Sequence, residues 1–480
     1  MTLTRTIIRG TTVVDVRTGS LQPEMDVAIE GGRIAALTVT NQIRPDTTAR
    51  VVEAQGTYTV PGFCDMHAHP LDRRNPEPAL RLMLTTGVTA FRQMSGSPRL
   101  LASRAAGQML LPADGAALVT MPGEILWGLN AGTEEAAVRT VRKQADGGAD
   151  FIKVAMVNAP VFFAAQTEAA RLGLTTVGHL PVGIDVRAAS DGRMRSIEHL
   201  GLPSVGVVAA CCDHEADIQH AAVRRGNLAL PPIASIPFAE RLLNSLMTRM
   251  VDRIVINPLL LARPADAELV AEADRTFNLD KARILARTLA SDGTWQCPTL
   301  IRLRTQQFFD DPLYEEQPEN RYASHQTLRR WRKAARKYGS RPHLLRTAYQ
   351  HLYERQLTMV RIFDEEGVNM LAGSDASGSG WEIPGFALHR EFEQLAAAGL
   401  TPLRILQMAT INAAEFLGRT ATMGTVEPGK DANLVLLGEN PTASVSNLHQ
   451  IVGVVRAGQH YSAAALARIA ETAATDRSAV

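Results

Sequence analysis

Apolar and polar positions alternate with a period of two in short runs at both ends of the chain. TIIRGTTVVDV, MDVAIEGGRIAAL and ARVVEAQGTYTV, all within residues 1–60, are rich in β-branched residues and are separated by glycines. Such runs are typical of strands. Near the other end, GTVEPGKDANLVLLG combines a Pro-Gly turn with an apolar strand, and IVGVVRAGQ follows the same pattern. The pattern predicts one small β-sandwich domain assembled from residues 1–59 and 421–480.

The middle of the chain alternates between short apolar runs and longer helix-like stretches. VTAFRQM, AALVT, DFIKVAM, GLTTVGHL, RSIEHL, QCPTL and VNMLAGSDA are separated by segments such as TEEAAVRTVRKQADGGA, in which alanine and charged residues recur at helical spacing. This alternation indicates βα units and a parallel sheet. With TYTVPGFCDMHAH as the first strand, the total of about eight predicts an α/β fold, a (β/α)8 TIM barrel over residues 60–420. An open doubly-wound sheet is the alternative, and the lack of G-x-G-x-x-G after the first strand disfavours it.

Two stretches exceed what a minimal barrel needs. Residues from about 205 to 294 form a helix-prone excursion, and residues from about 302 to 356 are charged and helix-prone. Both are expected to wall or cover the mouth of the barrel. The second contains the basic run TLRRWRKAARKYGSRPH. That run fits a nucleic-acid patch or a solvated helix face, and the neutral overall charge favours the solvated face.

Composition narrows the class of protein without naming an activity. Among 480 residues, 50 Lys and Arg oppose 49 Asp and Glu, so the formal net charge is +1. No global field therefore favours nucleic acid or an anionic membrane. No run of about 18 uncharged apolar residues is present and the start lacks a signal-peptide pattern, so a membrane span and secretion are not expected. Four cysteines do not make a disulfide framework in this length, and free thiols in a cytoplasmic protein, away from the active site, are expected.

The candidate chemistry starts at His67-Ala68-His69, which ends the first predicted barrel strand. Residues two apart in a strand point to the same side, so both imidazoles can converge on one point. Barrel enzymes carry their active sites at the carboxyl ends of the strands. Taken alone, an H-x-H pair in a chain with 12 histidines also fits surface or capping histidines.

Four further strands carry a metal-compatible group. Lys153 lies inside the apolar strand DFIKVAM, where a lysine is rarely tolerated unless it is paired or chemically used; snorkelling to the strand end is the alternative. His179, His199 and Asp375 end later strands, and each alone could be a helix cap or a satisfied polar residue. A barrel would gather all of these groups at one end. Imidazole and carboxylate ligands suit Zn²⁺, Mn²⁺, Co²⁺ or Fe²⁺, and the absence of cysteine ligands argues against a closed structural zinc site.

In order and context, these motifs resemble the amidohydrolase superfamily, in its binuclear subtype with a carboxylated lysine. PGFCDMHAHP is similar to the family's first-strand motif, GADFIKV carries the lysine, and VGHLP and IEHL carry the next histidines. LAGSDA supplies the aspartate, and GLTPLRILQMATINAAEFLG followed by GTVEPGKDANLVLL resembles the closing signature. Within the superfamily, the pattern is similar to the imidazolonepropionase- and prolidase-like branch, where G-H-L/V-P is followed by I-E-H-L.

The resemblance implies that six residues bind two divalent metal ions: His67, His69, Lys153, His179, His199 and Asp375. The H-x-H pair and Asp375 would bind the more buried ion, and the other two histidines the second. Lys153, carboxylated by CO2 on its ε-amine, would bridge them. Zn²⁺ is the expected metal, with Mn²⁺, Co²⁺ and Fe²⁺ as alternatives. A hydroxide bridging the metals would attack the substrate, with Asp375 as general base and then general acid.

The implied activity is a metal-dependent hydrolase that cleaves an amide-like C–N bond. Candidate substrates are dipeptides, N-acyl amino acids and xenobiotic amides, carbamates or ureas. Two alternatives stay open: a mononuclear cyclic amidohydrolase or deaminase, with Lys153 unmodified, and a non-catalytic amidohydrolase-like scaffold. The expected partner is a small-molecule substrate, with no nucleic acid and no membrane, and the protein is expected to be a cytoplasmic homo-oligomer.

Three features lack an assigned role. Arg92 is followed by Gln93, where relatives commonly carry an acidic residue. The arginine could meet a substrate carboxylate or lie in a structural ion pair, and both hypotheses stay open. Cys211 and Cys212 have no family role, and His214 is expected at the surface.

Overall fold

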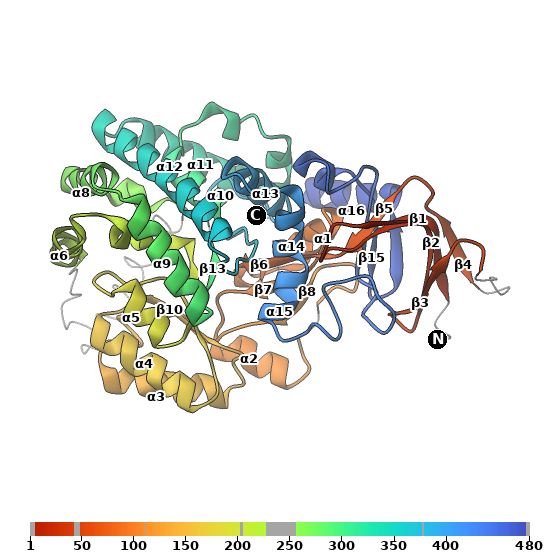
Figure 1. Cartoon of the computed structure of the whole chain (residues 1–480), viewed down its shortest axis with the longest axis horizontal. Helices are drawn as coiled ribbons and strands as arrows, with labels where there is room; N and C mark the ends of the chain where they lie inside the picture. The colour runs from red at the N-terminus through yellow and green to blue at the C-terminus, as the bar shows by residue number, and fades with distance from the viewer. Residues whose placement is uncertain are drawn as a thin grey trace.

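The computed structural model is a mixed α/β structure with a sheet domain at one end, and Figure 1 shows helices around a core of strands. The described residues are 5–42, 49–109, 111–201, 205–226, 256–376 and 379–476. Part of the predicted excursion at 205–294, residues 202–204, and a few residues of the terminal domain lie outside these ranges. None of the described helices is long and apolar enough to cross a membrane.

The two ends of the chain meet in one eight-stranded sheet, on the right of Figure 1. Its order is β16-β15-β14-β5-β1-β2-β3, with β4 paired to β1. The strands are β1 (Thr6–Val14), β2 (Leu21–Glu30), β3 (Arg33–Val39), β4 (Arg50–Glu53), β5 (Tyr58–Pro61), β14 (Leu434–Leu437), β15 (Ile451–Arg456) and β16 (Gln459–Ser462). The segments join where β14 pairs antiparallel with β5, with Val435 opposite Val60. This confirms the predicted domain from both termini.

The middle of the chain forms parallel strands. One sheet contains β6 (Phe63–Ala68), β7 (Val88–Gln93) and β8 (Ala117–Thr120). The other contains β9 (Leu126–Trp127), β10 (Ile152–Met156), β11 (Thr176–Gly178), β12 (Met194–Glu198) and β13 (Trp295–Cys297). Parallel bridges join Gln296 to Met370 and Ala376 to Ala68, so residues 370–376 sit between β13 and β6 as an eighth strand. The predicted barrel order is confirmed.

The third barrel strand is divided in two. β8 pairs with β7 and β9 pairs with β10, so together they fill one position between their neighbours. Pro122 lies in the interruption and has no N–H to donate to a ladder. The backbone there is also crowded, because a side chain at Gly96 would come within 2.1 Å of the Pro122 carbonyl oxygen. The proline and this close approach explain why the apolar run does not continue as one strand.

Helices cover the outside of the barrel, as its alternating sequence predicts. They include α1 (Glu77–Thr85), α2 (Pro98–Ala105), α3 (Glu134–Asp146), α4 (Ala159–Arg171), α5 (Val186–Asp191), α9 (Leu279–Asp292), α13 (Phe386–Ala397), α14 (Pro402–Ala409) and α15 (Ile411–Phe416). Side-chain oxygens of Thr133 and Asn158 accept hydrogen bonds at the starts of α3 and α4, which satisfies otherwise unpaired N–H groups. Helix α16 (Ala463–Asp476) returns from the terminal sheet to pack on α1.

The described parts of the two long segments are helical. The first contains η3 (Gly206–Cys211), α6 (Glu215–Gly226), η5 (Pro258–Leu261), α8 (Pro264–Arg275) and α9; the second contains α10 (Leu300–Gln307), α11 (His325–Gly339) and α12 (His343–Glu365). The basic run forms α11, which buries Leu328, Trp331 and Tyr338 and exposes cations such as Arg329 and Lys333. A covering role for these segments, and the absence of a nucleic-acid partner, stay predictions.

Candidate metal centre

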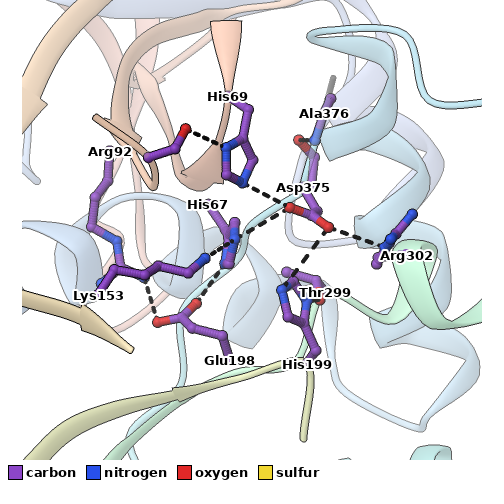
Figure 2. A network of polar contacts seen from close by, with 12 residues as sticks. His67, His69, Arg92, Lys153, Glu198, His199, Thr299, Arg302, Asp375 and Ala376 are labelled. Carbon is purple, nitrogen blue, oxygen red and sulfur yellow. Dashed lines mark hydrogen bonds and ion pairs between the residues drawn. The ribbon is translucent and has the colours of Figure 1, made fainter. Parts of the chain in front are cut away.

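The strand ends converge on Asp375, which lies at the centre of Figure 2. Its Oδ1 is 3.2 Å from His67 Nε2 and 3.0 Å from His69 Nε2. Its Oδ2 is 3.9 Å from His199 Nε2. The ligand atoms of His67, His199 and Asp375 all lie within 4.8 Å of one another, which is the spacing of a shared cation site. The structure therefore brings these predicted residues together.

Lys153 also reaches this centre. Its side chain is buried on β10, and its Nζ lies 3.0 Å from His67 Nε2, so the alternative of snorkelling to solvent is excluded. Burial lowers the pKa of the amine from its usual value. A neutral amine is the form that reacts with CO2, so the environment suits the predicted carboxylation.

His179 follows β11 and lies beside His199, with ring centroids 5.1 Å apart. Burial lowers the pKa of His179 to about 3 and holds the pKa of His199 well below its usual value. Both imidazoles are therefore neutral at physiological pH, and neutral imidazole is the metal-binding form. Among the contacts of the described residues, His179 has no direct one to Asp375 or Lys153.

The outer nitrogens of His67, on β6, and of His69, which directly follows β6, are oriented by hydrogen bonds. His67 Nδ1 lies 2.7 Å from Glu198 Oε2, and His69 Nδ1 lies 2.8 Å from Ser95 Oγ. A histidine that donates from Nδ1 to a carboxylate keeps the lone pair of Nε2 available for a metal. In both residues Nε2 is the nitrogen that faces Asp375.

Arg92 lies in a structural ion pair, which decides between its two interpretations. The side chain is fully buried, with Nη2 2.8 Å from Glu198 Oε1 and Nε 2.5 Å from the Met66 carbonyl oxygen. Glu198 also accepts a hydrogen bond from Ser196 Oγ at 2.5 Å. Arg92 therefore fixes the carboxylate that fixes His67, and it is not free to meet a substrate carboxylate.

Exchanging Glu198 for glutamine is expected to weaken metal binding or activity by about 10- to 100-fold, because the carboxylate that orients His67 loses its charge. Metal affinity is measured by competition with a chelator, alongside the stability of the metal-free protein. Glu168→Gln is a matched control, since Glu168 on the outer helix α4 pairs with Arg171 of the same helix and with Arg142 of α3. Unchanged metal affinity in Glu198→Gln would contradict the orienting role.

Several residues of the site were not predicted. Thr299, in a left-handed conformation with φ 45°, contacts His199 Nδ1 through its hydroxyl. Arg302 Nε lies 3.1 Å from Asp375 Oδ2. Asp65 accepts hydrogen bonds from the backbone N–H groups of His67 and Ser374. Of these residues only Asp65 had a signal in the sequence, a carboxylate inside an apolar strand.

The cysteines agree only in part with expectation. All four are buried and free. The prediction that they lie away from the site is wrong for Cys297, whose Sγ is grouped within 4.8 Å with ligand atoms of His67 and Glu198, because β13 ends beside them. Burial raises the pKa of this thiol well above its usual value, so it is a neutral thiol and not a thiolate ligand. His214 lies at the surface, 2.6 Å from Glu272, as expected.

A small cavity of about 40 Å³ lies just beyond the ends of β11 and β12. Residues that follow His179 and His199 line it, among them Leu180, Ile184 and Gly201. Its walls are formed mainly by apolar side chains and glycines.

Comparisons with known proteins agree with this geometry. Residues 323–460 match the Amidohydrolase family. An adenine deaminase of Moorella thermoacetica is 45% identical over 65 residues, which cover 13% of this chain and 10% of that protein. A D-hydantoinase of Streptomyces coelicolor is 42% identical over 67 residues, 14% of each chain. These matches thus span only about a tenth of the curated relatives' length.

Solved structures match over almost the whole chain. A bottromycin amidohydrolase has a TM-score of 0.67 at 23% identity and covers 98% of this chain and 90% of its own. A Xaa-Pro dipeptidase has a TM-score of 0.60 at 16% identity, over 95% of this chain and 100% of its own. Residues 323–460 are therefore similar to the Amidohydrolase family, and the chain has the fold of the bottromycin amidohydrolase and of the Xaa-Pro dipeptidase.

Proposed function

We propose that the protein is a metal-dependent hydrolase that cleaves an amide-like C–N bond in a small molecule. The observation that carries the proposal is the convergence of buried imidazoles and a buried lysine on Asp375, at the ends of separate barrel strands. The names of the matched proteins support it, since deaminase, hydantoinase, dipeptidase and amidohydrolase all denote hydrolysis at a C–N bond.

The donor set fits a pair of divalent cations. The six residues that would hold them are His67, His69, Lys153, His179, His199 and Asp375. Imidazole nitrogens with one carboxylate suit Zn²⁺, Mn²⁺, Co²⁺ or Fe²⁺, and carboxylation of Lys153 would add an anionic bidentate ligand. When bound, such ions supply Lewis acidity and lower the pKa of water toward neutrality.

Asp375 is suited to proton transfer. Burial by itself would raise the pKa of its carboxyl group, but electrostatic attraction to the His199 and His67 rings and hydrogen bonds to His67 and His69 hold that pKa well below its usual range. The residue is therefore an anion at neutral pH. It can accept a proton from the attacking water and return it to the leaving nitrogen.

The surrounding residues keep the site dry and rigid. His67, Lys153 and His199 are at most 3% exposed. Charges and dipoles act more strongly in such an environment than in water, and fixed groups need little reorganisation during reaction. Glu198 and Ser95 form hydrogen bonds with Nδ1 of His67 and of His69, and Arg92 holds Glu198 in place.

Metal content and a substrate screen test the proposal together. Protein reconstituted with Zn²⁺, Mn²⁺ or Co²⁺ is expected to retain about two ions per chain and to hydrolyse members of a panel of dipeptides, N-acyl amino acids, lactones and carbamates. One ion per chain would favour the mononuclear alternative. Failure to bind any divalent ion would contradict the proposal and favour the non-catalytic scaffold.

A further inference from the structure

A second group of buried polar atoms lies beside the metal centre. Figure 2 shows Arg302 on the side of Asp375 away from Lys153 and Glu198. Arg302 belongs to α10 and is 8% exposed. Neither Arg302 nor the groups described next are among the predicted metal ligands, so their purpose needs a separate explanation.

Only some of the nitrogen atoms of the Arg302 guanidinium have hydrogen-bond partners among the described residues. Nε lies 3.1 Å from Asp375 Oδ2. Nε and Nη2 also lie 2.6 and 3.2 Å from the Gln306 side-chain oxygen, in the amide orientation that satisfies both groups. Nη1 is buried and has no hydrogen-bond partner among the described residues. A buried charged donor without a partner is costly, which indicates a group that binds there.

The chain after Asp375 adds two more groups. Glu382 is 1% exposed; its Oε1 accepts a hydrogen bond from Thr305 Oγ1 at 3.0 Å, whereas Oε2 has no partner among the described residues. Ser379 is close enough to lower the pKa of Glu382, yet its buried Oγ lacks hydrogen-bond geometry to any described residue. Burial outweighs Arg302 and raises the pKa of Glu382 to about 8, so Oε2 is able to donate a proton at neutral pH.

Two non-glycine residues near these groups have strained backbone conformations. Asp375 and Trp381 have φ values of 60° and 65°, in the left-handed region that non-glycine residues rarely adopt. Trp381 is fixed by a hydrogen bond from its Nε1 to the Phe309 carbonyl oxygen at 3.2 Å and by the rings of Phe309, Tyr314 and Trp331. Strain of this kind collects at functional sites, where the surrounding packing maintains it.

We propose that Arg302, Ser379 and Glu382 form a subsite for a carboxylate of the substrate, next to the bond that is cleaved. A guanidinium N–H, a hydroxyl and a protonated carboxyl group are all donors, and a carboxylate offers two acceptor oxygens with about four lone-pair sites. A neutral amide or urea offers these three donors a single carbonyl oxygen, whereas a carboxylate offers two charged oxygens.

The position of Arg302 also indicates which carboxylate of the substrate would bind in the subsite. Its guanidinium touches the same Asp375 that delivers the proton to the leaving nitrogen. In an N-acyl amino acid or dipeptide, the α-carboxylate of the leaving amino acid is separated from that nitrogen by one carbon atom. The substrate class is therefore an amide whose leaving group is an amino acid with a free carboxylate. This inference rests on the proposed function.

The test uses matched probes, a panel of N-acetyl amino acids and their carboxamides, with metal-loaded protein. Binding is measured by calorimetry and hydrolysis by amine release. Wild-type protein is expected to prefer the free acid by at least about tenfold in Kd and in kcat/KM. Ser379→Ala and Glu382→Gln, which leave the Asp375–Arg302 pair intact, are expected to reduce this preference with unchanged metal content.

Arg302→Lys is expected to raise Kd and KM for the acids by about 10- to 100-fold and to leave those for the carboxamides nearly unchanged. Arg346→Lys, at a half-buried pair with Asp310, is the control. Equal binding of acids and carboxamides, or of neither, would overturn the subsite. Selective binding of acids without hydrolysis would contradict the proposed function alone. If Arg302→Lys lowers kcat for both probe types equally, the arginine positions Asp375 and the subsite is wrong.

Discussion

Replacing Asp375 by asparagine is expected to lower kcat by about 10³-fold, the typical contribution of a general acid–base group. The amide cannot accept a proton from water or return it to the leaving nitrogen. It also removes the anion that lies within 3.2 Å of the Nε2 atoms of both His67 and His69, so metal affinity falls as well. Steady-state kinetics at saturating metal, with metal content measured on the same sample, separates the two effects.

Asp364→Asn provides the matched control for this change, because Asp364 pairs with Arg404 at 2.8 Å between outer helices. Loss of the charge at Asp375 leaves the buried Arg302 without its anionic partner, so the metal-free variant is expected to be less stable by about 3 kcal/mol. Denaturant unfolding checks that value. An Asp375→Asn variant that kept full metal content and wild-type kcat would exclude the residue from proton transfer.

Replacing Lys153 by alanine is expected to reduce the bound metal from about two ions per chain to one or fewer, with a loss of at least about 100-fold in kcat/KM. The reason is that Lys153 enters the centre from β10 with its Nζ 3.0 Å from His67 Nε2, where a carbamate would reach both ions. Metal analysis and kinetics on the same preparation measure the two losses. The exposed Lys143→Ala on α3 is the control.

Adding small molecules to the Lys153→Ala variant tests whether Lys153 acts in the wild-type protein as a carboxylated lysine or as a free amine. The alanine leaves space for a short carboxylate, so propionate is expected to restore part of the activity and of the second metal, whereas propylamine is not. Rescue by propylamine, or full activity without rescue, would exclude the bridging carbamate. It would favour the mononuclear alternative, in which Lys153 is unmodified.

The convergence of His67, His69 and Asp375 could be predicted because it depends on local rules. His67 and His69 lie on one side of a strand, and a barrel directs the ends of all its strands to one place. The pairing of residues 370–376 between β13 and β6 places Asp375 at that same end. No knowledge of packing between distant segments was needed for these residues.

Arg302 and Glu382 could not be predicted in this way. Their importance depends on how α10 contacts Asp375 and Glu382, and an arginine or a glutamate in a charged stretch usually faces solvent. Glu198 is an intermediate case. A carboxylate in an apolar strand beside His199 was a visible signal, but its partners, Arg92 and His67, come from other strands.

The division of the third strand was also beyond the sequence pattern. AALVT predicted the strand β8, but the short strand β9 (Leu126–Trp127), which follows the interruption at Pro122, was not predicted. The outcome depends on β9 finding its own partner in β10, a contact that the order of residues does not reveal.

The pairing of β5 with β14 has a consequence for biosynthesis. Strand β5 leads through Gly62 directly into β6, which carries His67 and ends just before His69, yet its antiparallel partner β14 does not begin until residue 434. The first strands of the sheet must therefore wait on the ribosome with an open edge until β14 emerges. A chain that stops prematurely before residue 434 lacks that partner altogether, so a truncation far from the barrel in sequence acts on the strand that feeds the metal centre.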